Sequence, residues 1–488
     1  MVDVCLMLEG TYPYVTGGVS SWVNQLIQNL PDTTFGIVHI SASRDEIRGF
    51  KYKMPANVKQ FHEVFLHDYH YDSIPDFKKS SGNWPSSFEV LINSIYSGEG
   101  RFEPLFNELF FSEKSPSFEE IFFSEKTWKI LLKHYNKEAS EESFLDYFWT
   151  WRFTMMPFFR MFYMKFPKAR LYHSVSTGYA GAAGTAASIR YNRPFIITEH
   201  GIYTRERHME IEEASWITGG NEKRVFKNID FFKEMWKKTF YAMSRLAYER
   251  SNRIITLCSS NMAAQISDGA PPEKCEIIPN GIFFEKFIHS NKKKKENTET
   301  VPVIGFAGRV VAIKDIKTLI RSVSIIRDKI ECQLMIMGPT DEEPEYYNEC
   351  LELIHMLALE DTIVFTGTVD LIKIMPEIDI LVLTSVSEAQ PIVILEANAA
   401  GVPVVATDVG ACREMLEGEN DTLGPGGMVV NVATPEETAD AVIDILLDDE
   451  KRKEMGRNGR QRVERFYHQQ DLLARYNSIY ENLISGIN

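Results

Sequence analysis

Two carboxylates stand eight positions apart in the segment TSVSEAQPIVILEANAAGVPVVATDVG, which runs from Thr384 to Gly410. Glu388 and Glu396 are surrounded there mainly by small and apolar residues. A carboxylate among Ile, Val, Leu and Ala costs free energy unless hydroxyl or amide groups donate hydrogen bonds to it. Adjacent ribose hydroxyls would serve one carboxylate, and sugar hydroxyls the other. The simpler alternative is a charge at a helix N-terminus followed by one glutamate on an amphipathic face.

Two cations follow a predicted strand in the stretch GFAGRVVAIKDIKTLI. Arg309 comes directly after the strand, and Lys314 stands five residues later, just before a predicted helix. A helix N-terminus offers free N–H groups to an anion. An arginine holds phosphate oxygens in a fork, and a lysine adds a mobile point charge. The set predicts a diphosphate site, against the alternative of two solvated surface cations.

The first part of the chain has further candidates at the ends of predicted strands. In GTYPYVTGGVSSWV, Gly17 and Gly18 lie between a strand and a helix. Backbone without side chains lets a ligand approach closely there, although a tight turn is the simpler explanation. In TEHGIYTRER, a strand ends at Glu199, His200 and Gly201. A core histidine is often only hydrogen-bonded, but ligands of parallel sheets bind at these strand ends.

Familiar nucleotide-binding motifs are missing from the sequence. The segment STGYAGAAGTAA, which begins at Ser176, is not G-x-G-x-x-G, so the dinucleotide fingerprint fails. Its glycines and alanines are expected to let a helix pack closely on a sheet. The sequence also has no D-x-D pair and no P-loop, so no motif indicates a Mg²⁺-dependent nucleotide site.

The candidate residues require elements that bring strand ends to one edge of a sheet. Strands and helices alternate in two series, one at the start of the chain and resuming near residue 169, the other after Val301. This β-α-β order implies parallel sheets with helices on both faces. The sequence therefore predicts an α/β protein with two doubly wound, Rossmann-like domains facing each other across a cleft.

Composition shifts suggest where the domains begin and end. Residues 1–290 are predicted as the first domain, with an aromatic, acidic helical insertion at about 67–166. The insertion is either a partner surface or a lobe that only packs. The run HSNKKKKENTET, residues 289–300, is expected to be a solvated interdomain hinge. Residues 301–465 form the predicted second domain, and a helix over 466–488 is expected to pack back toward the first.

The overall composition limits the class of protein. The 488 residues carry a formal net charge of -15, which argues against nonspecific binding of nucleic acid. The six cysteines form no CxxC pair, which is typical of reduced thiols in a cytoplasmic protein. No apolar run approaches the about 18 residues of a membrane span. The apolar start VCLMLEG predicts a buried strand rather than a signal peptide.

Taken in order, these motifs resemble the retaining GT-B glycosyltransferases of family 4. The resemblance rests on the E-x7-E pair, the Arg/Lys set, the GGV loop, the EH strand end and the PNGI turn at 279–282, and it covers nearly the whole chain except the insertion. It implies a donor site, an acceptor loop and two catalytic side chains. The implied residues are Arg309, Lys314 and Gly18 at the donor diphosphate, Glu396 at the ribose, Gly17 and Gly18 in the acceptor and phosphate loop, and Glu388 and His200 as catalytic groups near the sugar.

Within that family, LEGTYPYVTGGVSSWV and TEHGIYTRER look closest to a cytosolic glycosyltransferase of an exopolysaccharide pathway. The narrower resemblance implies UDP-glucose as donor, a polysaccharide acceptor and retention of anomeric configuration. It implies no cofactor and no metal, with cations and helix dipoles stabilising the departing UDP. Implied partners are membrane-bound synthase or transport components at the inner face of the cell membrane. The strand YHSVS departs from the family's VHSH-like strand at Ser176, so no acceptor role is carried over to His173.

Two other functions stay open on the sequence alone. A nucleotide-sugar epimerase can share this architecture and would isomerise a UDP-sugar without an acceptor. A noncatalytic UDP-sugar-binding subunit would keep the fold without the chemistry. The E-x7-E pair together with the Arg/Lys set favours transfer over both.

Overall fold

The structure is a computed structural model that describes residues 1–44, 49–68, 84–113, 115–214, 229–288, 301–419 and 421–486. The chain forms two compact units. The first unit comprises residues 1–256, 262–277 and 476–488, and the second comprises residues 257–261 and 278–475. The predicted hinge at 289–300 lies outside the described residues. Among the helices that the structure describes, none is long and apolar enough to cross a membrane.

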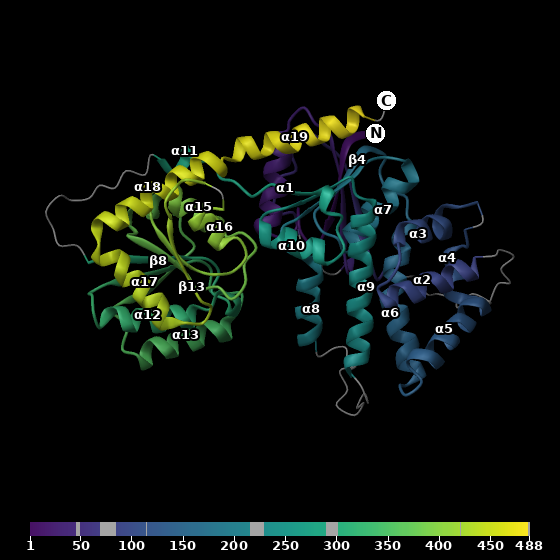
Figure 1. Ribbon diagram of the computed structural model, residues 1–488, viewed down its shortest axis with the longest axis horizontal. Helices are drawn as coiled ribbons and strands as arrows, with labels where there is room; N and C mark the ends of the chain where they lie inside the picture. Colours follow the sequence, from purple (N-terminus) through teal and green to yellow (C-terminus); the bar gives the residue numbers. More distant parts are fainter. Residues whose placement is uncertain are drawn as a thin grey trace. The chain divides into compact units, whose positions relative to one another are not determined.

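The first unit is built on a seven-stranded, all-parallel sheet (Figure 1). The strand order is β3-β2-β1-β4-β5-β6-β7, so the order reverses between β1 and β4. Ligands of such sheets bind beyond the carboxyl ends of the strands at this reversal, the topological switch point. The strands are β1 (Val2–Glu9), β2 (Phe35–Ser41), β3 (Val58–Phe65), β4 (Ala169–Ser174), β5 (Phe195–Glu199), β6 (Arg253–Thr256) and β7 (Cys275–Ile277).

The central strands follow the expectation of continuous apolar runs, because helices cover both faces of a parallel sheet. β1 and β5 are buried almost throughout. The edge strand β3 was not singled out from the sequence. Its residues VKQFHEVF are only partly buried and mix polar with apolar side chains, since β3 pairs on one side only, with β2.

The helices next to the sheet show why small residues occur where they do. They are α1 (Gly18–Asn29), α7 (Tyr179–Tyr191), α8 (Tyr203–Glu213), α9 (Ile229–Arg250) and α10 (Ser259–Ser267). The segment STGYAGAAGTAA leads into α7, which packs on β1, β4 and β5. A Cβ at Gly184 would lie 2.3 Å from the ring of Phe195. The prediction that this segment allows close packing of a helix on the sheet is confirmed.

The predicted insertion consists of α2 (Pro85–Ser97), α3 (Phe102–Phe111), α4 (Phe118–Phe123), α5 (Glu125–Glu138) and α6 (Phe144–Tyr163). Residues 69–83 and 114 of the predicted range lie outside the described residues. α6 packs on α7 and α9, and its buried rings share one hydrophobic core with the helices that cover the sheet (Figure 1). The insertion is therefore a helical layer of the first unit, built on α7 and α9.

The second unit contains a six-stranded parallel sheet with the order β10-β9-β8-β11-β12-β13. Its switch point lies between β8 and β11, which pair directly. The strands are β8 (Val303–Ala307), β9 (Gln333–Met337), β10 (Ile363–Gly367), β11 (Ile380–Leu383), β12 (Val404–Thr407) and β13 (Gly427–Val430). β11 and β12 are each two residues shorter than their predicted ranges, which began at Ile378 and Val402.

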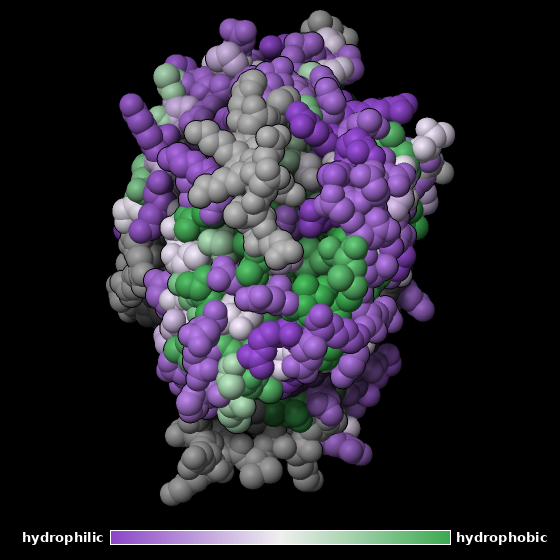
Figure 2. Space-filling view, turned by 90° about the vertical axis from the view of Figure 1, so that its left-hand side faces the viewer, coloured by the Kyte–Doolittle hydropathy of each residue, from purple (hydrophilic) through white to green (hydrophobic). Residues whose placement is uncertain are grey.

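Helices cover this second sheet on both sides, with α12, α13 and α17 on one side and α15 and α16 on the other (Figure 1). The helices are α11 (Glu285–Ile288), α12 (Ile316–Arg327), α13 (Pro344–Met356), α14 (Leu371–Ile374), α15 (Ile392–Ala399), α16 (Cys412–Glu417), α17 (Pro435–Leu447), α18 (Asp449–Phe466) and α19 (Gln469–Ser485). From Tyr476 onward, the residues of α19 belong to the first unit. The face shown in Figure 2 is mainly hydrophilic, with hydrophobic residues gathered near its middle, as expected of a chain with 25% charged residues.

Candidate functional site

Lys314 and Glu388 meet at the switch point of the second sheet. Lys314 ends a short 3-10 helix, Ala312–Lys314, that follows β8, and Glu388 lies in the loop that follows β11. Their side chains form an ion pair and are largely buried, 17% and 12% exposed. Seventy-four positions separate the two residues in the chain. Adjacent parallel strands bring them together, as expected of groups that serve one ligand at a switch point.

Hydrogen bonds fix the loop that carries Glu388. The hydroxyl of Thr384 donates to the carbonyls of Lys314 at 3.1 Å and Asp315 at 2.9 Å. The Ser385 hydroxyl donates to Oε1 of Glu388 at 2.7 Å. These contacts tie the loop after β11 to the loop after β8, so the ion pair sits on two segments that hold each other in place.

Gly410 closes the same loop from the side of β12. Its φ of +53° is in the left-handed region, and a Cβ there would lie 2.1 Å from the carbonyl oxygen of Glu388. The neighbouring Ala411 N–H donates to the carbonyl of Ala389 at 2.9 Å. Only glycine combines this backbone angle with so close an approach. The glycine is visible in the sequence at the end of ATDVG, but only the fold shows that it lies against the Glu388 carbonyl.

Arg309, the other predicted phosphate ligand, does not join this ion pair. It follows β8 as expected, but its guanidinium pairs with Glu342 from the loop after β9, and its side chain is 53% exposed. Arg309 is thus an exposed cation at the same carboxyl edge of the sheet as Lys314. Its partner Glu342 is also exposed, at 48%. A ligand could displace such a pair at little cost, because exposed ion pairs contribute little to stability.

Glu396 lies within α15, where its neighbours Leu395 and Ala397 are buried. Pro391, expected in the first turn of this helix, is its N-cap residue. Burial raises the pKa of Glu396 to about 7. No hydrogen bond between described residues joins Glu396 to Lys314 or Glu388. A carboxyl with such a pKa is one whose charge the surrounding groups do not stabilise, and hydroxyl donors from a ligand would supply that stabilisation.

A further clamp in the second unit was missed from the sequence. The side chain of Gln390 accepts a hydrogen bond from the Asn280 N–H at 2.6 Å and donates to the Asn280 carbonyl at 3.3 Å. It thereby ties the PNGI turn to the loop that carries Glu388. The turn was recognised by its residue types, but a glutamine 110 positions away carried no local signal.

At the carboxyl edge of the first sheet, Gly17 and Gly18 stand at the start of α1. No atom lies within 4 Å of the place that a Cβ would occupy at either glycine. Gly17 has an extended backbone with φ of 166°, which any residue adopts. Backbone strain therefore does not explain these glycines, whereas open space beside them is what a ligand-approach loop needs.

His200 follows β5 and is buried, 8% exposed. Its ring packs edge-on against Trp22 of α1, with centroids 4.7 Å apart. Burial lowers the pKa of His200 to about 4, so the imidazole is neutral near pH 7. It can therefore exchange hydrogen bonds with a ligand but carries no charge. The contact with Trp22 was not anticipated from the sequence.

Two neighbouring residues turn out to be internal. His173 Nδ1 lies 2.7 Å from the hydroxyl of Tyr480, and its Nε2 lies 2.9 Å from the hydroxyl of Thr198. Burial lowers the pKa of His173 to about 3. Glu199 accepts hydrogen bonds from Tyr248 at 2.6 Å and from Gln265 at 2.8 Å. Both side chains use their polar atoms inside the first unit.

One carboxylate at this edge was missed. Glu9 ends β1, and it accepts hydrogen bonds from the Ala180 N–H at 3.2 Å and the Tyr203 hydroxyl at 3.0 Å. Burial raises its pKa, and the guanidinium of Arg207 opposes that rise. In the sequence Glu9 was read only as the end of a buried strand. No group of three or more His, Cys, Asp or Glu among the described residues is arranged to hold a metal ion.

Comparisons with known proteins identify the families that the chain matches and the fold that it shares. Residues 2–273 match the family described as a domain of unknown function, DUF3492, and residues 288–462 match the family described as glycosyl transferases group 1. Sucrose-phosphate synthase from Thermosynechococcus elongatus shares the fold, with a TM-score of 0.60, 16% identity, and 99% of this chain and 100% of that chain covered. Anabaena HepE, solved with UDP and glucose, gives a TM-score of 0.58 at 14% identity, covering 99% and 100%.

Characterised relatives are similar over part of their length. N-acetyl-alpha-D-glucosaminyl L-malate synthase of Bacillus anthracis is 24% identical over 49% of this chain and 62% of its own. The MMP alpha-(1→4)-mannosyltransferase of Mycolicibacterium hassiacum is 26% identical over 60% of this chain and 66% of its own. The chain thus spans less than two thirds of the length of these relatives.

Two parallel-sheet units of this kind, with a group 1 glycosyl transferase domain, define the GT-B class of glycosyltransferases. Within that class, the chain belongs to the DUF3492 family. The predicted α/β architecture of two doubly wound units, with a helical insertion in the first, is confirmed.

Proposed function

We propose that the protein is a retaining, metal-independent glycosyltransferase that moves glucose from UDP-glucose to a growing exopolysaccharide. The observation that carries the proposal is the meeting of Lys314 and Glu388 at the switch point of the second sheet. A cation and a carboxylate on interlocked loops suit a ligand that offers both phosphate oxygens and sugar hydroxyls. A sugar diphosphate nucleotide offers both.

The proposed donor roles follow from these positions. Lys314 gives up part of its contact with Glu388 to bind the diphosphate, and Arg309 leaves Glu342 to do the same. Glu396 accepts hydrogen bonds from the ribose hydroxyls, and Glu388 binds the donor sugar. As the sugar–phosphate bond breaks, the cations stabilise the UDP leaving group, a contribution typically worth about 10²–10³ in rate for each contact. The departing phosphate takes the proton of the acceptor hydroxyl on the same face of the sugar, which retains configuration.

For the first unit we propose roles on the acceptor side. Gly17 and Gly18 let the acceptor and phosphate approach the backbone, and neutral His200 exchanges hydrogen bonds with the sugar. The choice of UDP-glucose and of an exopolysaccharide comes from the resemblance of LEGTYPYVTGGVSSWV and TEHGIYTRER to PelF, the cytosolic glycosyltransferase of the Pel exopolysaccharide pathway of biofilms. The relatives above are named for the transfer of different sugars, so they do not select a donor.

We also propose that the protein works in the cytoplasm, at the inner face of the membrane, through membrane-bound synthase or transport partners. Exposed aromatic side chains of α6 support a partner surface, since Trp149 is 44% and Phe153 is 54% exposed. Replacing both by serine should leave UDP release in solution unchanged and should abolish recovery of the protein with cell membranes. Equal recovery of wild type and variant would refute this surface.

A panel of UDP-glucose, UDP-galactose, UDP-N-acetylglucosamine and GDP-mannose tests the transfer. UDP release with a glycosylated product is expected for UDP-glucose, with and without EDTA, and NMR of the new linkage should show the donor's anomeric configuration. Conversion of the sugar without UDP release would identify an epimerase. Binding without either reaction would identify a noncatalytic subunit.

A further inference from the structure

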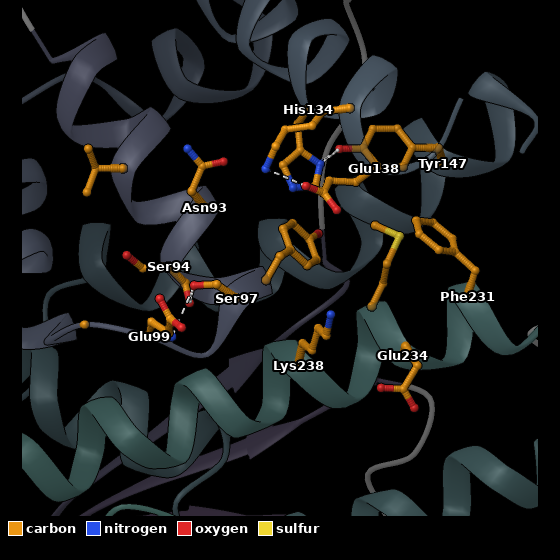
Figure 3. Close-up of a pocket in the computed structure, with 15 residues that line it drawn as sticks. Asn93, Ser94, Ser97, Glu99, His134, Glu138, Tyr147, Phe231, Glu234 and Lys238 are labelled. Atoms are coloured by element: carbon orange, nitrogen blue, oxygen red, sulfur yellow. Dashed lines mark hydrogen bonds and ion pairs between the residues drawn. The ribbon is translucent and has the colours of Figure 1, made fainter. Parts of the chain in front are cut away.

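A cavity of about 550 Å³ lies away from both sheet edges, between α2 and α5 of the insertion, the start of α6, and α9 (Figure 3). Its volume is within the range of sites that bind small molecules. All the described residues that line it belong to the first unit. None of the residues assigned above to donor or acceptor takes part, so the cavity needs an explanation of its own.

Three aromatic residues form one wall of the cavity. The rings of Tyr96 and His134 have centroids 4.8 Å apart, and His134 and Tyr147 stack with centroids 6.0 Å apart. His134 Nδ1 lies 2.8 Å from the Tyr147 hydroxyl. Tyr96 is only 8% exposed, and its hydroxyl, near Thr154, completes no hydrogen bond of normal geometry with a described residue. Because Tyr147 and the Tyr96 hydroxyl are fully buried, the wall offers a ligand ring surface of Tyr96 and His134, each 8% exposed.

The rim supplies hydrogen-bonding groups of both kinds. Asn93 and Ser97 face the cavity from α2, and Lys238 rises toward it from α9, whereas Glu234 of α9 points away (Figure 3). Two lysines and three glutamates line the cavity in all, and Lys137 already pairs with Glu138 at 2.6 Å. A site with this balance has no excess positive charge to attract phosphate or nucleic acid. It suits a neutral ligand with many hydroxyls.

A second cavity, of about 620 Å³, adjoins the first. Tyr96, Ser97, Glu234 and Lys238 line both, so the two cavities lie next to each other along α9, and together they are called the groove below. The far end of the groove includes Arg207, whose charge acts on Glu9 at the carboxyl end of β1. The groove thus runs from the helical insertion to a residue beside the ligand-binding edge of the first sheet.

We propose that this groove binds a linear chain of sugar units, which makes the insertion a saccharide-binding layer of the first unit. Aromatic faces cover the apolar faces of sugar rings, while amide, hydroxyl and ammonium groups pair with the ring hydroxyls. An elongated groove holds several units in a row, as a compact pocket would not. The assignment of this chain as the acceptor or product rests on the proposed transfer; binding of the saccharide does not.

The test is calorimetric titration of the full-length protein with malto-oligosaccharides and chito-oligosaccharides of two to seven units. In one of the two series, affinity is expected to rise at least tenfold from two units to six, because each added ring occupies more of the groove. Asn93→Ala and Lys238→Ala, both at exposed positions, should each lower the affinity for the longest oligomer at least fivefold. Lys129→Ala, an exposed lysine of α5 outside both cavities, is the matched control and should bind as the wild type does.

Three results would overturn the groove. They are no binding of any oligomer in either series, affinity that does not depend on length, and length-dependent affinity that neither groove variant changes. Titration of the same samples with UDP separates this inference from the proposed transfer. A protein that binds oligosaccharide but not UDP refutes the transfer and keeps the groove, whereas one that binds UDP but no oligosaccharide does the reverse.

Discussion

Glu396 shows how burial and charge compete at a single residue. Burial within α15 raises the pKa of its carboxyl from 4.5 to about 7. The folded protein therefore holds a proton there that the unfolded chain gives up at lower pH. The stabilising contribution of this raised pKa is fully present below about pH 4.5 and is lost as the pH rises to about 7.

Comparison with Glu396→Gln tests this effect on stability. The amide cannot ionise, so the free energy of unfolding of wild type minus that of the variant should decrease between about pH 4.5 and 7 and stay constant above. Chemical denaturation of both proteins across this range measures the difference, in which other titrating groups cancel. A difference that does not change with pH would show that Glu396 titrates normally.

The same carboxyl should control UDP binding. Only the ionised form accepts hydrogen bonds from two ribose hydroxyls at full strength, so the affinity of the wild type for UDP should rise from pH 6 to pH 8. Glu396→Gln should bind UDP more weakly by about 1.5–3 kcal/mol at pH 8, the usual cost of losing a hydrogen bond to a charged group. Its affinity should not vary with pH in this way. Calorimetry at several pH values checks both statements, and wild-type affinity in the variant would remove Glu396 from the ribose site.

Glu388 is expected to behave differently, because it contacts Lys314 rather than an apolar surface. In Glu388→Gln the Lys314 ammonium loses its charged partner and becomes fully available to phosphate. UDP affinity should be equal to or higher than that of the wild type, while kcat should fall, since contacts to the reacting sugar strengthen in the transition state. Steady-state kinetics and UDP titration on one preparation measure both. Weakened UDP binding with unchanged kcat would reverse the roles of the two glutamates.

At the scale of elements, the site depends on how the loops after β8, β11 and β12 hold each other. Thr384 ties the loop after β11 to the loop after β8, and Gly410 lets the loop after β12 approach the Glu388 carbonyl. These contacts involve the backbone of Lys314 and Glu388, not the side chains that are proposed to bind the donor. They determine where Lys314 and Glu388 lie, so changing them should affect the reaction without removing any reacting group.

Gly410→Ala and Gly367→Ala form a matched pair that tests this dependence. Both glycines have positive φ, +53° and +67°, but nothing lies within 4 Å of a Cβ at Gly367. Gly367→Ala should cost only the backbone strain, about 1–2 kcal/mol of stability. Gly410→Ala adds the clash with Glu388, so it should cost more and should also lower kcat. Equal stability and activity in the two variants would show that the approach at Gly410 does not position the loop.

At the scale of the whole molecule, two units with separate hydrophobic cores make two-step unfolding the natural expectation. The side chains proposed to bind UDP, Lys314, Glu396 and Arg309, all belong to the second unit, whereas Gly18 of the first unit contributes only backbone. UDP at 100 times its dissociation constant should stabilise that unit by about 2.7 kcal/mol. Scanning calorimetry should therefore show two transitions, only one of which moves to higher temperature with UDP. In Glu396→Gln the shift should shrink, and a UDP shift of both transitions in parallel would argue for a single cooperative unit.

The sequence by itself determined the order of strands and helices and the class of fold. Periodic burial and β-α alternation are local properties, and parallel β-α-β units leave few topologies open. The ends of buried strands could be located in the same way, which placed Lys314, Glu388 and His200 at sheet edges. The edge strand β3 was not predicted, because its partly exposed residues do not form the continuous apolar run that marks a central strand.

Only the tertiary structure decided which of those residues meet. It joined Lys314 to Glu388 across 74 positions and paired Arg309 with Glu342 instead, outcomes that depend on which strands are neighbours. It turned His173 inward onto Tyr480, across 307 positions of the chain. It also formed the groove along α9, whose lining comes from helices that carry no motif. Contacts of this range follow from packing in three dimensions, because residue types along a single segment do not encode which distant segment will lie against it.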